Sequence, residues 1–232
     1  MANIQKEFTN FKIHSQYSIC EGAIKIEDLA AVAKEKKIKS LGLCDSYNLC
    51  GALEFAEKIS KSGTQPIIGT QINFKFEETT GKIPLFATTS KGYKSLTRLS
   101  SKSYLESDGK SEAFCNLSDL NTINEDLILL TGNQNDLFGK LFFLNKLKLI
   151  ENILFNLKKI FKDKIYIEIQ RHNETNEKKY EDFLVNLSKK VEVPLIASQE
   201  VFYINQDMHE AHDALICIGE KTFVDDSNRK KY

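Results

Sequence analysis

Short apolar segments alternate with longer amphipathic segments along the chain. Runs of mainly apolar residues, each bounded by polar or turn-forming residues, predict seven β-strands. These predicted strands are Phe11–His14, Leu41–Asp45, Pro66–Phe74, Ile83–Thr88, Asp126–Thr131, Lys164–Gln170 and Val193–Ala197. The alternation is typical of an α/β protein with a largely parallel sheet whose strands are joined by helical crossovers.

Six further segments place apolar residues at the spacing of an amphipathic helix. They are Ile26–Lys37, Gly51–Ser62, Tyr93–Tyr104, Asp136–Phe161, Lys178–Lys190 and Asp207–Ile218. The chain offers about seven strand–helix units, slightly fewer than the eight of the usual (β/α) barrel. This count fits a distorted, seven-fold version of that barrel better than a two-winged open sheet. We therefore expect a distorted seven-fold (β/α) barrel.

The chain is expected to form one domain over residues 1–220. It has only three prolines and no Pro-rich or Ser-rich linker that would divide it. Residues 221–232 are polar and charged and contain no pattern of a helix or strand. We interpret this last stretch as the start of a connection to further sequence.

The amino-acid composition excludes several classes of protein. Hydrophobic residues make up 41% and charged residues 28% of the 232 residues, which is typical of a folded globular protein. The apolar runs are far shorter than the roughly 20 residues of a membrane span. Lys plus Arg and Asp plus Glu each total 32, so the chain lacks the positive charge of non-specific DNA binding. The five cysteines show no CxxC spacing, which favours a reducing, cytoplasmic location.

Polar residues cluster where the predicted strands end, and in a parallel barrel those ends carry the functional residues. His14, Asp45, His172 and Glu200 are candidate metal ligands, because imidazoles and carboxylates together hold Zn or Mn and activate water. The set is too poor in imidazoles for a cluster of several metals. No GxSxG, P-loop or Asp-x-Asp motif is present, so neither a serine nucleophile nor two-metal nucleotidyl transfer is expected of this chain.

Several segments, in the same order along the chain, resemble the PHP (polymerase and histidinol phosphatase) domain that opens bacterial DNA polymerase III alpha subunits. They are Phe11–Ser18, Cys44–Phe55, Pro66–Gly69, Ile167–His172, Pro194–Ala197, Glu210–Leu215 and Asp225–Arg229. The resemblance implies a PHP-type distorted barrel and a parent chain that is a DNA-directed DNA polymerase acting in DNA replication. It also implies that residues 221–232 lead toward the polymerase core.

The same resemblance implies a degenerate metal centre. Family members with an intact centre carry other, ligating residues at five positions of this sequence. The altered positions are Lys12, Ser46, Gln71, Asn133 and Phe202. The vestigial site that remains is His14, Asp45, His172 and Glu200. The domain itself is thus expected to have no catalytic residues and no bound metal.

Lys12 suggests how such a site could survive without a metal. A lost cation leaves buried carboxylates unpaired, which is costly, and an ammonium group could replace it. We expect Lys12 to pair with Asp45 or Glu200. On the predicted C-terminal helix, His209 and His212 are three residues apart, and we interpret them as structural rather than as ligands.

The resemblance also implies partners: the rest of the polymerase alpha chain and the separate proofreading exonuclease subunit, with DNA reached only through the full holoenzyme and no membrane contact. An alternative is an active metal-dependent phosphoesterase, either a 3'-5' proofreading exonuclease or a pyrophosphatase. It would use His14, Asp45, His172 and Glu200 with Zn or Mn. A freestanding PHP phosphatase unrelated to replication is a third hypothesis.

Overall fold

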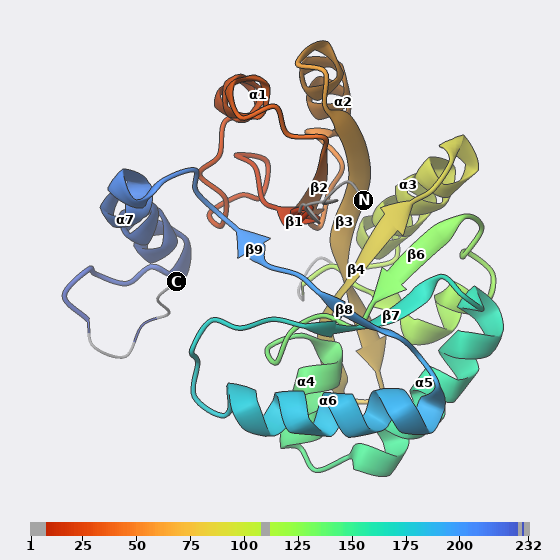
Figure 1. Ribbon diagram of the computed structural model, residues 1–232. Helices are drawn as coiled ribbons and strands as arrows, with labels where there is room; N and C mark the ends of the chain where they lie inside the picture. Colours follow the sequence, from red (N-terminus) through yellow and green to blue (C-terminus); the bar gives the residue numbers. More distant parts are fainter. Residues whose placement is uncertain (1–7, 108–111, 227–228, 230–232) are drawn as a thin grey trace, which may run out of the picture.

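The computed structural model of the protein describes residues 8–107, 112–226 and 229 (Figure 1). Residues 227, 228 and 230–232 of the expected connection lie outside this part, so the boundary at residue 220 stays a prediction. All seven predicted strands are present. The strands are β1 (Lys12–Ile13), β2 (Ser40–Ser46), β3 (Gln65–Phe76), β4 (Thr79–Ala87), β5 (Cys115–Asn116), β6 (Leu127–Leu130), β7 (Ile165–Ile169), β8 (Leu195–Ala197) and β9 (Glu200–Val201).

The strands form one sheet in the order β8-β7-β6-β4-β3-β2-β1-β9, with β5 beside β3. Most neighbouring pairs are parallel, but β4 runs antiparallel to both β3 and β6. No helix was predicted between Pro66–Phe74 and Ile83–Thr88, and β4 is the exception in the largely parallel sheet. Only Glu77 and Glu78 separate β3 from β4, and Glu77 has φ 50°, so the two strands form a hairpin.

The sheet is curled into a distorted barrel, which confirms the predicted fold class (Figure 1). Its two end strands, β8 and β9, are consecutive in the chain and are separated only by Ser198 and Gln199. The backbone itself thus joins the two ends of the sheet. β9 was not predicted, because two residues are too few to show a strand period.

Helices surround the curved sheet (Figure 1). They are α1 (Ile26–Glu35), α2 (Ala52–Lys61), α3 (Ser90–Leu105), α4 (Leu137–Phe143), α5 (Leu147–Phe161), α6 (Glu177–Val191) and α7 (His209–Glu220), with 3-10 turns at Leu117–Asn121 and Gln206–Met208. The single helix predicted over Asp136–Phe161 is wrong. It is divided at Asn145, whose φ of 58° lies in the left-handed region and cannot continue a helix.

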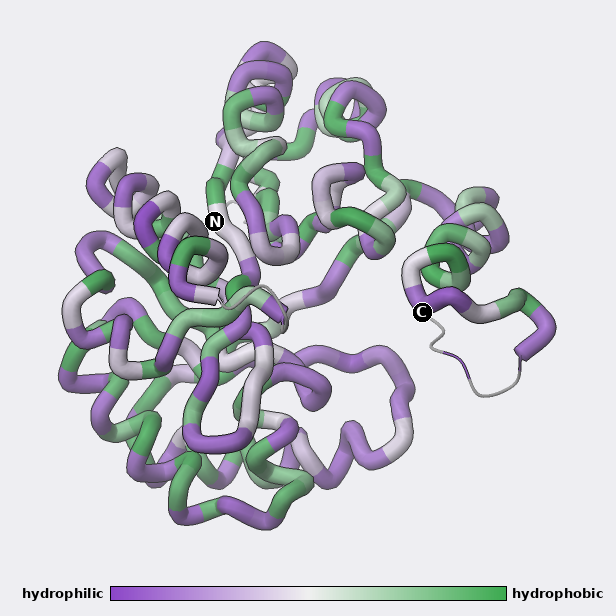
Figure 2. The backbone as a smooth tube through the Cα atoms, turned by 180° about the vertical axis from the view of Figure 1, so that it is seen from behind, coloured by the Kyte–Doolittle hydropathy of each residue, from purple (hydrophilic) through white to green (hydrophobic). Residues whose placement is uncertain are grey.

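Each strand turns alternate side chains to the helices and to the barrel interior. Ile13 packs in a cluster with α1 and α2, and a larger cluster lies beneath α3 to α6. Hydrophobic and hydrophilic residues alternate within the helices, as expected for elements with one face on the sheet (Figure 2). Inside the barrel, Cys44, Phe86 and Leu130 form a small apolar cluster. Within the described residues, no helix combines the length and hydropathy that crossing a membrane requires.

Candidate functional site

A cleft of about 740 Å³ lies at the carboxyl end of the parallel strands. Its volume is in the range of small-molecule sites. Residues from the loops after β1, β2, β6 and β7 border it, together with β4 and β9. The charged and aromatic residues among them include Glu21, Tyr47, Lys82, Asp136, His172, Glu200 and Phe202.

Lys12 lies beneath this cleft and is fully buried. Its Nζ is 3.2 Å from Glu168 Oε1 and 3.3 Å from Glu200 Oε1. Neither contact has the angles of a hydrogen bond, so the group is held by charge. The register of β1 against β9 pairs Lys12 with Glu200, which fixes the second contact through the backbone. Lys12 thus pairs with Glu200, which is one of the two partners expected from the sequence.

The surroundings of Lys12 and Glu200 favour the charged form of each group, as the directions of their pKa shifts show. Burial lowers the pKa of Lys12, but the carboxylates of Glu168 and Glu200 raise it by more, so it lies above its usual value. Burial likewise raises the pKa of Glu200, but Lys12 and His14 lower it by more. Both groups are therefore ionised at neutral pH.

Two further side chains, at positions that the family resemblance implies are altered, contact the same carboxylate. The Gln71 amide donates to Glu200 Oε1 at 2.9 Å, and the Asn133 amide donates to Glu200 Oε2 at 2.7 Å. Each of the two oxygens of Glu200 therefore receives a donor from a side chain that stands at an altered ligand position.

His14 lies beside this cluster. Its Nε2 is 3.3 Å from Glu200 Oε1 and its Nδ1 is 3.4 Å from Ser18 Oγ. The Phe202 ring, at another altered position, stacks on the imidazole with 4.5 Å between ring centroids and 13° between planes. Phe202 covers His14 by packing and has no atom that could ligate a metal.

Of the two partners expected for Lys12, Asp45 is the one that does not pair with it. Ser15 and Ser18 satisfy it instead: Oδ1 accepts from Ser15 N and Ser18 Oγ, both at 2.7 Å, and Oδ2 accepts from Ser15 Oγ at 2.8 Å. Burial raises the pKa of Asp45, and these hydrogen bonds oppose the shift. Ser18 Oγ contacts both Asp45 and His14, so it links the two residues.

Ser46, the fifth altered position, belongs to a second ion pair. Lys82 Nζ lies 2.8 Å from Glu21 Oε1 and 3.1 Å from Ser46 Oγ, and Ser46 Oγ donates to Glu21 Oε2 at 2.5 Å. Burial lowers the pKa of Lys82, but Glu21 raises it by more. The ammonium also lies 5.0 Å from the centroid of the Tyr47 ring. A second, half-buried cation therefore lies at the mouth of the barrel.

Asp136 is a further acid in the cleft and is 5% exposed. Its Oδ2 accepts from the Asn133 backbone N–H at 2.8 Å. Burial raises the pKa of Asp136 to about 7, with Lys12 opposing and Glu200 reinforcing the shift. This carboxyl is therefore poised to change its charge near neutral pH.

His172 lies apart from the other candidate ligands. It is exposed, with Nε2 3.0 Å from Gln170 Oε1 and Nδ1 3.1 Å from Gln199 Nε2. It borders the same cleft, but His14, Asp45 and Glu200 are not among its hydrogen-bond partners. Among the described residues, no group of three or more His, Cys, Asp and Glu side chains has the arrangement of a metal site.

Sequence reasoning missed Glu168, Asp136, Glu21 and Lys82. One signal was available for Glu168: it interrupts the apolar strand β7, where Ile165, Ile167 and Ile169 alternate with residues that face the barrel interior. A charged residue at such a position needs a buried partner. No comparable signal marks Lys82, because its partner Glu21 belongs to a distant loop.

The comparisons with known proteins agree on one family. The model of the PHP domain family matches residues 10–172. DNA polymerase III alpha subunits are similar over nearly the whole chain. The subunit of Rickettsia bellii is 35% identical over 230 residues (98% of this chain, 20% of the relative), and that of Caulobacter vibrioides is 34% identical over 232 residues (97% and 20%). The chain thus spans about a fifth of the length of these relatives.

Two solved structures share the fold at 10% sequence identity. One is an amidohydrolase from Chromobacterium violaceum with bound sulfate and no metal, with a TM-score of 0.55 over 90% of this chain and 97% of that one. The other, from Bifidobacterium adolescentis, is assigned as a metal-dependent phosphoesterase, with a TM-score of 0.51 over 84% and 87%. At this identity the likeness concerns the fold alone.

Proposed function

Since the chain belongs to the PHP domain family and is homologous over nearly its whole length to DNA polymerase III alpha subunits, we propose that it serves as the PHP domain of such a subunit. Its parent chain is then a DNA-directed DNA polymerase of DNA replication. The similarity of about a third of the residues, sustained along nearly the whole chain, supports this assignment over a freestanding phosphatase.

The domain itself is proposed to have no hydrolytic activity. The observation that carries this proposal is the Lys12 ammonium between Glu168 and Glu200. A divalent cation that used either carboxylate would be repelled by this fixed positive charge. The amide groups of Gln71 and Asn133 also occupy Glu200 as donors, whereas a metal needs oxygen, nitrogen or sulfur lone pairs. The residues present therefore do not fit a multi-metal centre, and no catalytic step is assigned to one.

The proposed role is structural. The domain would support the rest of the alpha chain and offer a surface to the proofreading exonuclease subunit in the cytoplasm, with DNA reached only through the holoenzyme. The neutral balance of 32 basic and 32 acidic residues supports an indirect contact with DNA.

Elemental analysis tests whether the protein holds the metal that a hydrolytic activity would require. The protein is purified without chelator, incubated with Zn or Mn, and dialysed. We expect well below one equivalent of either metal per chain, and the same result for His14→Ala and for His209→Ala, a control histidine outside the cleft. One equivalent or more that disappears in His14→Ala and Asp45→Ala but persists in His209→Ala would instead establish the phosphoesterase alternative.

Size-exclusion chromatography of the complete alpha subunit with the exonuclease subunit tests the proposed partner. Co-elution of the two proteins is expected to be lost when residues 1–220 are deleted from the subunit, provided that the deleted subunit still elutes as a folded monomer. Retained co-elution would show that the exonuclease binds elsewhere.

A further inference from the structure

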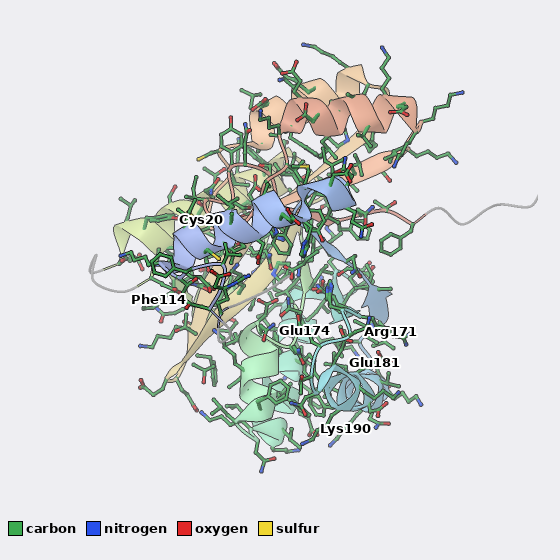
Figure 3. All side chains as sticks on the ribbon, turned by 90° about the vertical axis from the view of Figure 1, so that its left-hand side faces the viewer. Cys20, Phe114, Arg171, Glu174, Glu181 and Lys190 are labelled. Carbon is green, nitrogen blue, oxygen red and sulfur yellow. The ribbon has the colours of Figure 1, made fainter. Side chains whose placement is uncertain are left out.

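Four large apolar side chains near the end of α7 are exposed, and we call them the α7 patch. They are Ile19 (75% exposed), Ile218 (71%), Phe223 (78%) and Val224 (53%). The helix lies at the edge of the molecule (Figure 1). Its Gly219 approaches Cys20 of the loop after β1, and Figure 3 shows Cys20 beside the helix. Ile19 and Ile218 are the chain neighbours of these two residues, so the contact brings them to the same part of the surface.

Hydrogen bonds fix the backbone that carries the patch. After α7, Lys221 has φ 55° and reverses the chain, and the Thr222 N–H donates to the Cys217 carbonyl at 3.0 Å. The Phe223 N–H then donates to Asp226 Oδ2 at 2.9 Å, and the Asp226 N–H donates to the Phe223 carbonyl at 3.0 Å. The turn after α7 is therefore closed by its own hydrogen bonds, although its apolar side chains remain exposed.

Arg229 fastens the following chain to the same place. Its guanidinium forms a bidentate ion pair with Asp213 of α7, with Nη2 2.5 Å from Oδ2, and its Nε donates to the Val224 carbonyl at 3.0 Å. The Arg229 side chain is 3% exposed. A bidentate pair of this kind holds both partners in a fixed geometry. At residue 229 the chain therefore still lies within the reach of one arginine side chain of the α7 patch.

The composition of this region is that of an interaction surface. Single exposed apolar residues are common on proteins, but a group of them beside polar residues marks a site of contact. Glu220, Lys221 and Asp225, which flank the patch residues along the chain, are exposed and charged. An apolar centre with a polar rim is the usual anatomy of an interface.

We propose that the α7 patch is the docking surface for the polymerase sequence that follows residue 232. This inference rests on the proposed function, because the chain spans about a fifth of the length of the DNA polymerase III alpha subunits that it resembles. The following sequence starts four residues after Arg229, beside the patch. A covalently attached segment has a high effective concentration at a nearby surface, which favours it over a separate protein. The patch fits an amphipathic segment whose apolar face covers Ile218 and Phe223.

Hydroxyl-radical footprinting of the complete alpha subunit tests this surface. Peptide mass spectrometry measures the oxidation rate of Phe223 against two phenylalanines elsewhere, Phe143 of α4 (47% exposed) and Phe155 of α5 (41%). An uncovered Phe223 would oxidise faster than both controls, since it is more exposed and chemically identical. We expect it to oxidise several-fold more slowly than the faster control. A rate equal to or above that control would overturn the proposal.

The same measurement identifies what covers the patch. Protection of Phe223 is expected to be independent of protein concentration and to need no other protein. Protection that disappears on dilution would mean a second copy of the chain, and protection that appears only with the exonuclease subunit would mean that subunit. Either result overturns the proposal. A benzophenone crosslinker at position 223 should join the chain to one of its own peptides after residue 232, and a crosslink to another protein would contradict the proposal.

Failure of this inference can be told from failure of the proposed function. The length and polymerase activity of the native gene product test the function. An active, full-length polymerase with a readily oxidised Phe223 would keep the proposed function and overturn only the docking surface. A native chain that ends near residue 232 would overturn both.

Discussion

Glu200 is contacted by four polar side chains from three segments of the chain: Lys12 and His14, Gln71, and Asn133. Three of these four stand at positions where the family resemblance implies lost ligands. These three side chains are related physically, because each brings positive charge or an N–H donor to the Glu200 carboxylate, whose side chain is 11% exposed. Cationic and N–H donor side chains of this kind stabilise carboxylates that have no metal cation beside them. Any one of the three alone would leave the Glu200 carboxylate with too few partners.

Replacing Lys12 by Met tests this dependence. The variant leaves Glu168 and Glu200 without their shared cation, so we expect the free energy of unfolding to fall by about 3–5 kcal/mol. Urea denaturation at neutral pH measures it. Lys91→Met, which removes an exposed pair with Glu125, should change stability by less than about 1 kcal/mol. Equal losses of unfolding free energy in the two variants would show that the buried ion pair contributes no more to stability than the exposed one.

The raised pKa of Asp136 predicts that its contribution to stability falls as the pH rises, whereas that of an ordinary salt-bridged acid increases. Its pKa is raised to about 7 in the folded protein, so between about pH 4 and 7 the folded state holds a proton that the unfolded state has released. This group's contribution to stability therefore falls as the pH rises through that window. The stability of Asp136→Asn relative to the wild type should increase from pH 5 to pH 8, measured by urea denaturation at each pH. A constant difference would contradict the raised pKa.

The sequence predicted some contacts of the candidate residues and missed others. Lys12, His14 and Glu200 meet as expected, because they lie on the paired strands β1 and β9 or directly after β1. The expected Lys12–Asp45 contact fails because the local serines satisfy Asp45 first. Contacts such as Lys82 with Glu21 depend on the curvature of the sheet, which no local pattern encodes.

At the scale of elements, the period of apolar residues located every long helix and strand. It did not show the break in Asp136–Phe161, since α4 and α5 both have apolar residues at helical spacing across it. The break depends on one backbone conformation at Asn145. Asn tolerates this conformation better than other non-glycine residues.

Replacing Asn145 by Val tests the role of this residue in the turn. A β-branched side chain at φ 58° should lower the free energy of unfolding by about 1–2 kcal/mol. Asn145→Gly, which accepts the conformation without strain, should stay within about 0.5 kcal/mol of the wild type. Thermal or urea unfolding measures both variants. A Val variant as stable as the Gly variant would show that the turn imposes no left-handed constraint.

At the scale of the whole molecule, ring contacts connect α7 to the barrel. Phe202 stacks on His14 on one side and lies 5.7 Å from the His212 ring on the other. His212 is buried, and its Nε2 is 2.7 Å from the Glu21 carbonyl oxygen. Gly219 of the same helix approaches Cys20 so closely that a Cβ would lie 2.6 Å from the Cys20 Cβ. The helix is thus fastened to the loop after β1, and the Phe202 ring lies between its His212 and His14.

His212→Ala should therefore loosen α7 while leaving the sheet intact. The lost ring packing and hydrogen bond are expected to cost about 2–4 kcal/mol of local stability. Hydrogen exchange of the α7 amides should accelerate strongly, while that of β2 and β3 should not. Glu210→Ala, an exposed change on the same helix, serves as the control. Equal acceleration in helix and sheet would mean that α7 and the barrel unfold together.

The pairing of β1 with β9 has a consequence for the order of folding. These strands come from the two ends of the described chain, so their contacts close a very long loop, and such contacts form late. During synthesis on the ribosome, the first strand emerges carrying Lys12, but both carboxylates that neutralise it are made much later. A nascent barrel therefore keeps an open seam, and an ammonium that lacks the second of its two carboxylates, until Glu200 has been added. The pairing of β1 with β9 completes both the sheet and the set of charges around Lys12.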